Sequence, residues 1–513
     1  MERPHRNKIV FSAARNPEAF IGALAAFCLI YFSSPSIGLS PDSISYTSAA
    51  RSLCSTGSPI EFDGEWMMDF PLGYPALLSL IIFVTRLDPF QFGLLLNALL
   101  FGCLVFICLQ ETKRNGFPLF LRIGYGLSLL FSTALLQVYG MLWSETLFIL
   151  CVALFFLACG RYRSTHRKRA LWGMAGATAL ACVTRYIGVT LLGMGLLLLL
   201  ADPDLPWRKR VSHLFIYGVT GSSLLLVNLV VNRINGGNMA GDRLINHTPA
   251  TEHLRRFGTT LIHWLSIPPD SPAGYSRFPS PVLPMICATL FVGGSILGLL
   301  YLYRRKKSLY SWAALGLLFT SVYSLFILAL AILTAFQPLD SRLLSPLWFP
   351  ALGAAAGGIL ALIRRLPGKI LTLPAVILLV IPGSIREYRY LRDPERVYQD
   401  NIRYDFRPYS KSPTLQFIKD HPGLFHSDKP IYSNAGEILY VLSNLQSDYL
   451  PRLDLPAEIQ DFNSDSPYLV WLHAVHEYPF GYLSDLKKVS SLAALYSFPD
   501  GIIFSVRPVQ EKP

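Results

Sequence analysis

Charged residues are scarce in this chain of 513 residues: 15% are charged, whereas 52% are hydrophobic. Soluble proteins carry nearer a quarter charged residues, so the composition favours a membrane protein. The net charge of +12 could suggest nucleic acid as a partner. The basic residues, however, form short clusters between apolar segments, as in the cytoplasmic loops of membrane proteins. We therefore exclude nucleic acid.

The sequence also lacks a disulfide framework and internal repeats. Seven of its eight cysteines lie in apolar segments and none follows Cys287, which predicts neither disulfides nor a metal site. No repeat typical of solenoids or of inverted-repeat transporters is evident. The basic N-terminus leads into an apolar run without a small-residue cleavage site, so we expect a retained signal anchor.

Apolar runs long enough to cross a membrane recur over residues 1–385, which we interpret as a transmembrane module. We expect a mainly α, polytopic protein with about eleven transmembrane helices. They lie near residues 18–36, 90–110, 117–139, 142–159, 170–184, 187–200, 212–231, 282–303, 310–335, 343–363 and 369–385.

The charges of the connecting loops predict the orientation. Basic clusters alternate with loops of mixed charge, and the positive-inside rule then places the N-terminus in the cytoplasm and the C-terminus outside. Without disulfides or a retention signal, we favour a bacterial inner membrane. The basic clusters are the N-terminal arm and residues 111–114, 161–169, 207–210, 304–307 and 364–369.

Three segments are expected on the outer face. Residues 37–89 are amphipathic, and their stretch GYPALLSLIIFVTRL is short for a span and predicts an interfacial helix. Residues 232–281, rich in Gly, Pro and Asn, predict a loop. Residues 386–513 alternate strand-like and helix-like runs, so we expect a small periplasmic α/β domain. Within it, Ser412 and Pro413 are typical of a helix start.

Two acids at the predicted outer ends of spans are candidate catalytic residues. Asp42, in SPDSISY, is either only a helix N-cap or a general base held at the membrane surface. Glu145, in MLWSETLF, is a site candidate because an ionisable residue at a membrane is costly. Its alternative is a residue that simply reaches water.

Arginines near other outer turns are candidates for binding phosphate. Asp340 and Arg342, in LDSRLLSPLWFP, form either a surface ion pair of little energetic value or part of a phosphate site. Arg185, in CVTRYIGVT, invites the same interpretation. The cluster HAVHE at 473–477 follows a strand-like run, whereas two-histidine zinc motifs lie on helices, so we expect no metal there.

Three motifs in order resemble the GT-C superfamily of membrane glycosyltransferases, in particular the protein O-mannosyltransferase and lipid A aminoarabinose transferase group. They are PDSISYTSAARSL followed by MDFPLGYPALLSL, then MLWSETLF, then LDSRLLSPLWFP. The resemblance covers roughly residues 15–385. By position, Asp42 matches the catalytic acid of the first outer loop, Glu145 matches a second acidic position, and Arg342 falls near a turn that binds the donor phosphate.

The resemblance implies an inverting transferase that moves a sugar from a polyprenyl-phosphate donor to a glycan, lipid or protein on the outer face. Where the aminoarabinose enzymes have Glu-Lys-Pro-Pro, this chain has Asp69-Phe70-Pro71-Leu72, which disfavours an aminoarabinose donor. We expect the substrate to contact Tyr46, Asp69, Tyr74, Arg185, Tyr186, Asp340 and Arg342.

Other functions remain open at this point. Neither a Gly-rich phosphate loop nor an outer Asp-x-Asp motif is evident, so we expect no cofactor and no metal requirement. A flippase or transporter of a lipid-linked precursor is the alternative, although the acids lie at the outer surface rather than at mid-bilayer. A non-catalytic scaffold is the third possibility. It predicts that Asp42→Ala is silent.

Overall fold

The computed structural model describes most of the chain, in two units. The first unit comprises Met1–Gly38, Met68–Tyr74 and Leu87–Asn401, and the second comprises Leu39–Met67, Pro75–Arg86 and Ile402–Pro513. The described residues are 16–33, 37–241, 248–265, 281–305, 308–334, 338–365, 409, 411–421, 423–425, 429–453, 455–473 and 483–507.

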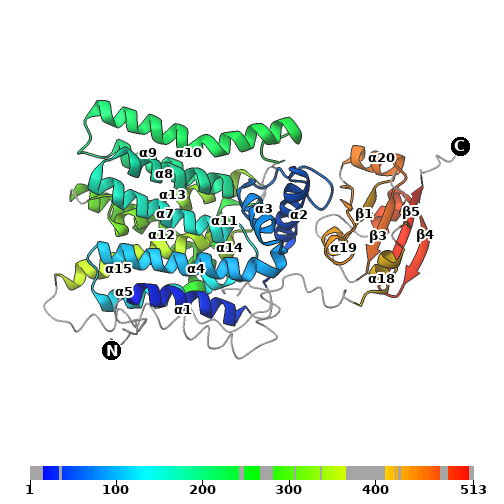
Figure 1. The fold of residues 1–513 in the computed structure, drawn as a ribbon, viewed down its shortest axis with the longest axis horizontal. Coiled ribbons are helices and arrows are strands. Elements are labelled where there is room, and N and C mark those ends of the chain that lie inside the picture. The colour runs from blue at the N-terminus through cyan, green and yellow to red at the C-terminus, as the bar shows by residue number, and fades with distance from the viewer. Residues whose placement is uncertain are drawn as a thin grey trace, which may run out of the picture. The chain divides into compact units, whose positions relative to one another are not determined.

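The first unit is a bundle of helices (Figure 1). Neighbouring helices in its main layer follow the order α1, α4, α7, α8, α10. The helices are α1 (Pro17–Phe32), α4 (Pro89–Arg114), α5 (Leu119–Leu130), α6 (Thr133–Tyr139), α7 (Glu145–Thr165), α8 (Lys168–Thr184), η2 (Tyr186–Gly188), α9 (Val189–Leu200), α10 (Trp207–Asn235), α11 (Ala250–Leu265), α12 (Val282–Arg304), α13 (Trp312–Leu333), α14 (Ser341–Leu344), η3 (Ser345–Leu347) and α15 (Trp348–Ile363).

Small residues allow close helix contacts in this bundle, as is common in membranes. A Cβ atom added to Gly22 of α1 would lie 3.0 Å from the carbonyl oxygen of Gly102 in α4. A Cβ added to Gly316 of α13 would lie only 2.3 Å from the carbonyl oxygen of Pro350 in α15. Larger side chains at these positions would separate the helices.

Ten of the predicted spans coincide with helices of the structure, and the expected span at 369–385 lies outside the described residues. By length and apolarity, six described helical segments could cross a membrane, or seven if the bent pair α5 and α6 is one span. The two helices are bent by 50° relative to each other. Ser132 lies at this break and caps α6, because its hydroxyl accepts a hydrogen bond from the Leu135 amide at 3.3 Å. The number eleven stays a prediction.

Helix α11 occupies part of the segment that we expected to be a loop. Its apolar face is buried: the ring of Phe257 contacts Phe291 of α12, with centroids 6.1 Å apart. Trp264 donates its indole N–H to Ser341 at 3.0 Å and packs edge-on against Trp348. The Gly, Pro and Asn residues around the helix obscured this amphipathic pattern in the sequence.

The second unit combines the early helices α2 (Pro41–Thr56) and most of α3 (Gly73–Thr85) with the C-terminal domain. Arg51 of α2 lies over the ring of Tyr440, 5.5 Å from its centroid. Phe62 contacts both Tyr440 and Tyr449. These aromatic contacts explain why residues 39–67 group with the C-terminal domain.

The predicted α/β character of the C-terminal domain is confirmed. A five-stranded sheet has the order β2-β1-β3-β5-β4, in which β1 pairs in parallel with β2 and β3, while β5 is antiparallel to β3 and β4. The elements are α18 (Pro413–Asp420), β1 (Ile431–Ser433), α19 (Gly436–Ser443), β2 (Asp448–Tyr449), α20 (Pro456–Ser464), β3 (Tyr468–Leu472), α21 (Leu483–Val489), β4 (Ser491–Phe498) and β5 (Gly501–Arg507).

Helices cover both faces of this sheet (Figure 1). Leu415 and Leu439, from α18 and α19, share a core with Val470 of β3 on one face, and Phe462 of α20 shares a core with Trp471 on the other. This explains why β3 is buried along its whole length. The predicted start of α18 is also confirmed, since the Ser412 hydroxyl accepts a hydrogen bond from the Leu415 amide at 3.1 Å.

Candidate active site

Hydrogen bonds fix the chain just before α7, where the candidate acid Glu145 lies. Asn97 of α4 is fully buried and its amide donates to the carbonyl oxygens of Tyr139 at 2.8 Å and Met141 at 2.7 Å. The Gly38 amide donates to the Gly140 carbonyl at 2.8 Å. The turn that leads into α7 is therefore held from two other parts of the first unit.

Glu145 lies between two arginines that come from distant parts of the sequence. Its side chain is 1% exposed. The Arg342 Nε atom lies 2.5 Å from Glu145 Oε1, and Arg342 Nη2 lies 3.4 Å from Oε2. Arg185 Nη1 lies 2.8 Å from Oε1 and also donates to the Ser144 hydroxyl at 3.0 Å. We call Glu145, Arg185 and Arg342 the arginine cluster.

Local structure brings each arginine to this place. Arg185 is the residue at which α8 ends and the short helix η2 begins. Arg342 lies in α14, whose N-cap is Asp340, and the Asp340 carboxylate accepts from the Leu343 amide at 3.0 Å. The guanidinium of Arg342 also lies over the ring of Trp143, 4.2 Å from its centroid. A cation at that distance is attracted by the ring.

The arginine cluster carries one negative and two positive charges, so its formal net charge is +1. A buried carboxylate needs such partners because its desolvation is otherwise very costly. Arg342 is nearly as buried as Glu145, whereas 18% of the Arg185 side chain is exposed. Among the described residues, Arg185 donates only through Nη1. Its remaining donors can serve an anionic ligand.

The structure thus joins three of the residues predicted from separate motifs. The alternative of a surface ion pair between Asp340 and Arg342 is wrong, because Arg342 is buried. The alternative that Glu145 simply reaches water is wrong for the same reason. In the structure, the Asp340 side chain caps the N-terminus of α14. Trp143 and Ser144 contact the arginine cluster, and their position directly before Glu145 in the sequence was the signal that could have identified them.

Other predicted substrate contacts gather around residues 68–74 of the first unit. The Tyr186 hydroxyl donates to the Met68 carbonyl at 2.9 Å, and the Leu72 amide donates to the Asn228 side chain at 2.9 Å. Tyr74 is fully buried and Asp69 is exposed. This segment is therefore held against η2 and α10.

Asp42 and Tyr46 lie in α2 of the second unit. The alternative that Asp42 is an N-cap is wrong: the cap is Ser40, which forms a capping box with Ser43. Asp42 instead lies at the second helical position, where a carboxylate interacts favourably with the helix dipole. It is partly exposed, whereas Tyr46 is buried. Its role as a base stays a prediction.

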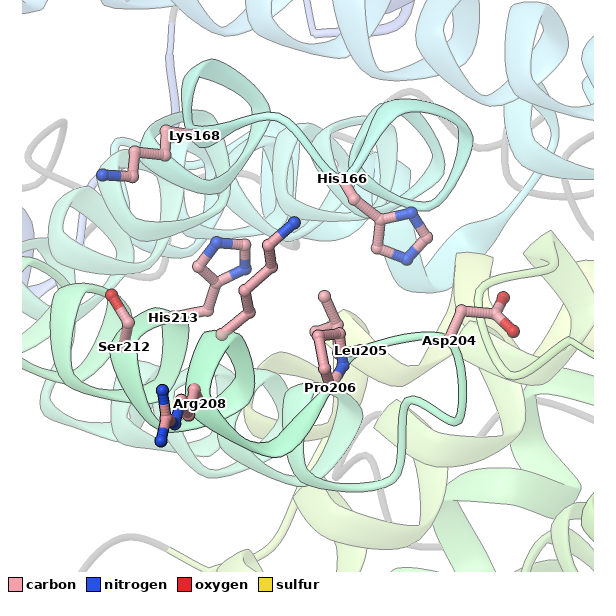
Figure 2. Close-up of a pocket in the computed structure, with 9 residues that line it drawn as sticks. His166, Lys168, Asp204, Leu205, Pro206, Arg208, Ser212 and His213 are labelled. Atoms are coloured by element: carbon pink, nitrogen blue, oxygen red, sulfur yellow. The ribbon is translucent and has the colours of Figure 1, made fainter.

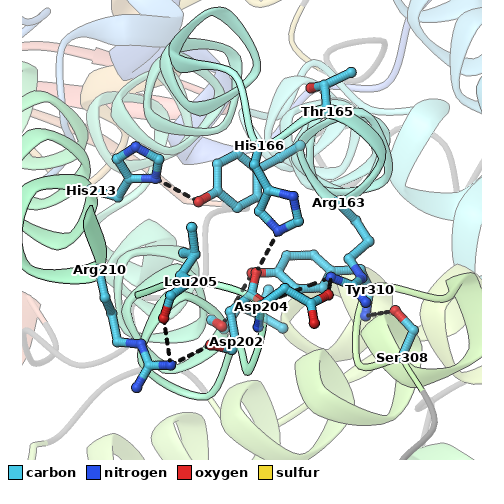
Figure 3. Close-up of polar contacts among 12 residues, drawn as sticks. Arg163, Thr165, His166, Asp202, Asp204, Leu205, Arg210, His213, Ser308 and Tyr310 are labelled. Carbon is cyan, nitrogen blue, oxygen red and sulfur yellow. Dashed lines mark hydrogen bonds and ion pairs between the residues drawn. The ribbon is translucent and has the colours of Figure 1, made fainter. Parts of the chain in front are cut away.

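A further polar cluster lies at the other end of α7 (Figure 3). In the described part of the chain, His166, Asp202 and Asp204 form the group whose ligand atoms, all within 4.8 Å of one another, could hold a metal ion. However, Arg163 pairs with both aspartates, and Tyr310 donates to Asp202 at 3.2 Å. Arg163 and Tyr310 therefore already occupy part of the ligand capacity of these carboxylates. From the sequence, residues 161–169 were predicted only as a basic loop.

Comparison with known proteins identifies the fold. No protein-family model and no curated protein sequence matches the chain. Two crystal structures of ArnT from Cupriavidus metallidurans do resemble it. The apo structure gives a TM-score of 0.60 at 13% identity, and the one bound to undecaprenyl phosphate gives 0.56 at 14%. Each likeness covers 96% of this chain and 98% of the other.

The chain has the fold of these ArnT structures. The fold that the motifs predicted, an apolar helical module followed by a small C-terminal sheet domain, is confirmed.

Proposed function

We propose that this protein is a membrane glycosyltransferase that transfers a sugar from a polyprenyl-phosphate donor to an acceptor on the outer face of a bacterial inner membrane. The observation that carries this proposal is the arginine cluster, in which Arg185 and Arg342 share the one carboxylate of Glu145. A surplus positive charge at the end of a membrane helix suits a phosphate at headgroup depth. The similar structure of ArnT from Cupriavidus metallidurans was solved with undecaprenyl phosphate bound, which supports the same class of ligand for this protein.

In this proposal Arg185 binds the donor phosphate directly. Its unused donors and partial exposure allow it to reach a ligand, while the buried Arg342 orients Glu145 and adds positive charge. Charge develops on the phosphate as the sugar departs, and guanidinium groups already in place stabilise it. Glu145, predicted as a catalytic acid, acts here as a positioning residue because its carboxylate is engaged by both arginines.

Asp42 is the proposed general base. The acceptor hydroxyl oxygen attacks the anomeric carbon, its proton passes to Asp42, and the bond from the anomeric carbon to the phosphate oxygen breaks with both electrons leaving on polyprenyl phosphate. Attack opposite to the leaving group inverts the configuration. Because arginines supply the charge stabilisation, we propose that the step needs no metal.

The decisive test is an assay of polyprenyl phosphate release by the purified full-length protein with a panel of radiolabelled polyprenyl-phosphate sugars and candidate acceptors. We expect release from one donor in the parent protein and at least about a hundredfold slower release in Asp42→Asn. Asp88→Asn, the same chemical change at the N-cap of α4, is the matched control and should retain activity.

Other outcomes would separate the competing functions. Donor binding without turnover, unchanged in Asp42→Asn, would overturn the transferase in favour of a transporter of lipid-linked precursors. Release that Asp42→Asn leaves intact would retain the transferase but remove Asp42 as its base. Absence of donor binding would leave a scaffold.

A further inference from the structure

A separate pocket lies beyond the C-terminal end of α7, the end farthest from Glu145. Helix α7 has 21 residues, and at 1.5 Å per residue it is about 30 Å long, which is the thickness of the hydrocarbon core of a bilayer. Beyond its last residue lies a cavity of about 570 Å³ (Figure 2). His166 and Lys168 line it from one side, and Arg208 and His213 of α10 line it from the other.

This pocket, which also includes Lys209, Ser212 and Asp204, has an excess of positive charge. In the described part of the chain, Lys168, Arg208 and Lys209 form no ion pair. The acid at its rim, Asp204, is engaged by Arg163 (Figure 3). Three cations therefore surround a cavity whose one lining carboxylate is already paired with another arginine.

The cations also lie at the unfavourable ends of their helices. Lys168 begins α8, and Arg208 and Lys209 lie in the first turn of α10, which contains no acidic residue. A cation near a helix N-terminus is repelled by the helix dipole. An anion in the pocket would relieve this repulsion and neutralise the side chains at once.

We propose that the pocket binds the phosphate group of an anionic membrane phospholipid. Helix α10 favours a lipid over a soluble phosphate because only 17% of its apolar window is buried in the protein. Trp207 and Phe215 of this helix are 64% and 70% exposed. Trp207 is thus suited to headgroup depth and Phe215 to the acyl chains. Basic pockets between membrane helices bind acidic headgroups in this way.

The test uses the full-length protein in neutral detergent, with lipid binding measured by native mass spectrometry. Phosphatidylglycerol is compared with phosphatidylcholine of the same chains and with inorganic phosphate. The double variant Lys168→Gln/Arg208→Gln should weaken phosphatidylglycerol binding roughly tenfold or more. The control Arg304→Gln/Arg305→Gln removes the same charge at the exposed end of α12 and should leave it unchanged.

A steric variant separates the pocket from its charge. Ser212 is exposed at the pocket wall, so Ser212→Trp fills the cavity while every cation stays, and we expect the same loss of binding. Equal losses in the α12 control, or no loss in Ser212→Trp, would show general surface attraction and overturn the proposal. If inorganic phosphate binds as tightly as phosphatidylglycerol, the pocket recognises a soluble phosphate rather than a lipid headgroup, and the proposal is overturned. A phosphatidylglycerol-dependent rise in melting temperature, absent from both pocket variants, is the second readout.

Discussion

In the two units of this protein, carboxylates that are shielded from water have neighbours of opposite charge. In the first unit, Glu145 is enclosed by two guanidinium groups. In the second unit, burial and the nearby carboxylates of Asp63 and Glu65 raise the pKa of Asp448 to about 6. Burial likewise raises the pKa of Glu437, with a further contribution from Asp63.

The difference shows that the neighbours of a carboxylate, rather than its burial alone, decide the local charge around it. Around Glu145 the local charge is positive, which suits a phosphate ligand. Around Asp448 it is negative, so the acids there repel one another and a phosphate alike.

The largest effect on stability is expected from Glu145→Gln. The change leaves the buried guanidinium of Arg342 and the partly exposed one of Arg185 without a counter-charge, which should destabilise the first unit by about 3–5 kcal/mol. Glu252 of α11 is the matched control, because it also contacts two arginines, Arg255 and Arg256, but is 27% exposed. Glu252→Gln should lower the free energy of unfolding by about 1 kcal/mol or less. Similar losses in denaturant titrations of both variants would contradict the account.

Substitution of the two arginines should have different effects: loss of Arg342 should mainly lower stability, and loss of Arg185 should mainly weaken donor binding. Arg342→Gln removes two hydrogen bonds to a buried charge and should destabilise the protein by about 1.5–3 kcal/mol. Arg185→Gln should change stability less, because Glu145 keeps Arg342, but should raise the KM for the donor roughly tenfold or more. Kinetics and melting curves of both variants check this. A destabilised Arg185→Gln with an unchanged KM would reverse the assigned roles.

The sequence predicted the features that depend on neighbours in the chain. The start of α18 at Ser412 and Pro413 is such a case, since a cap and its amide lie three residues apart. The helical nature of the apolar segments followed from hydropathy for the same reason. Local patterns failed at Ser132, where a continuous apolar run conceals the bend between α5 and α6.

The composition of the site could be predicted only in part. Sequence patterns singled out Glu145, Arg185 and Arg342 separately, but Arg342 and Glu145 are 197 residues apart. Their meeting depends on the break after α8 and on the short helix α14, which no periodicity reveals. For Asp42 the local pattern misled: a favourable cap residue was present, yet Ser40 takes that position.

The second unit should respond to pH through Asp448. Its pKa of about 6 exceeds the unfolded value of about 3.9, so the folded state holds a proton that the unfolded state has lost, and stability falls as the pH rises between these values. Asp448→Asn should stabilise the unit at pH 7.5 by less than about 1 kcal/mol, because solvent screens this partly exposed group. The gain should vanish near pH 4. Asp63→Asn should move the transition to lower pH.

A pH profile of the melting temperature checks this prediction. A stabilisation by Asp448→Asn that is equal at pH 4 and pH 7.5 would show that the repulsion is not what destabilises the parent protein.

The smallest effect is expected from chelation. Because guanidinium groups rather than a metal stabilise the leaving phosphate in our proposal, EDTA should leave the rate of donor turnover unchanged. Activity that is lost with EDTA and restored by a divalent cation would contradict this part of the account.

The most direct test of the central claim is the affinity of the protein for polyprenyl phosphate, the product of the proposed reaction. We expect Arg185→Gln to bind it roughly tenfold or more weakly than the parent protein. Asp42→Asn should bind it equally well, and so should Arg233→Gln, which removes an exposed arginine near the end of α10. Unchanged binding in Arg185→Gln would mean that the arginine cluster holds the bundle together but does not recognise the phosphate.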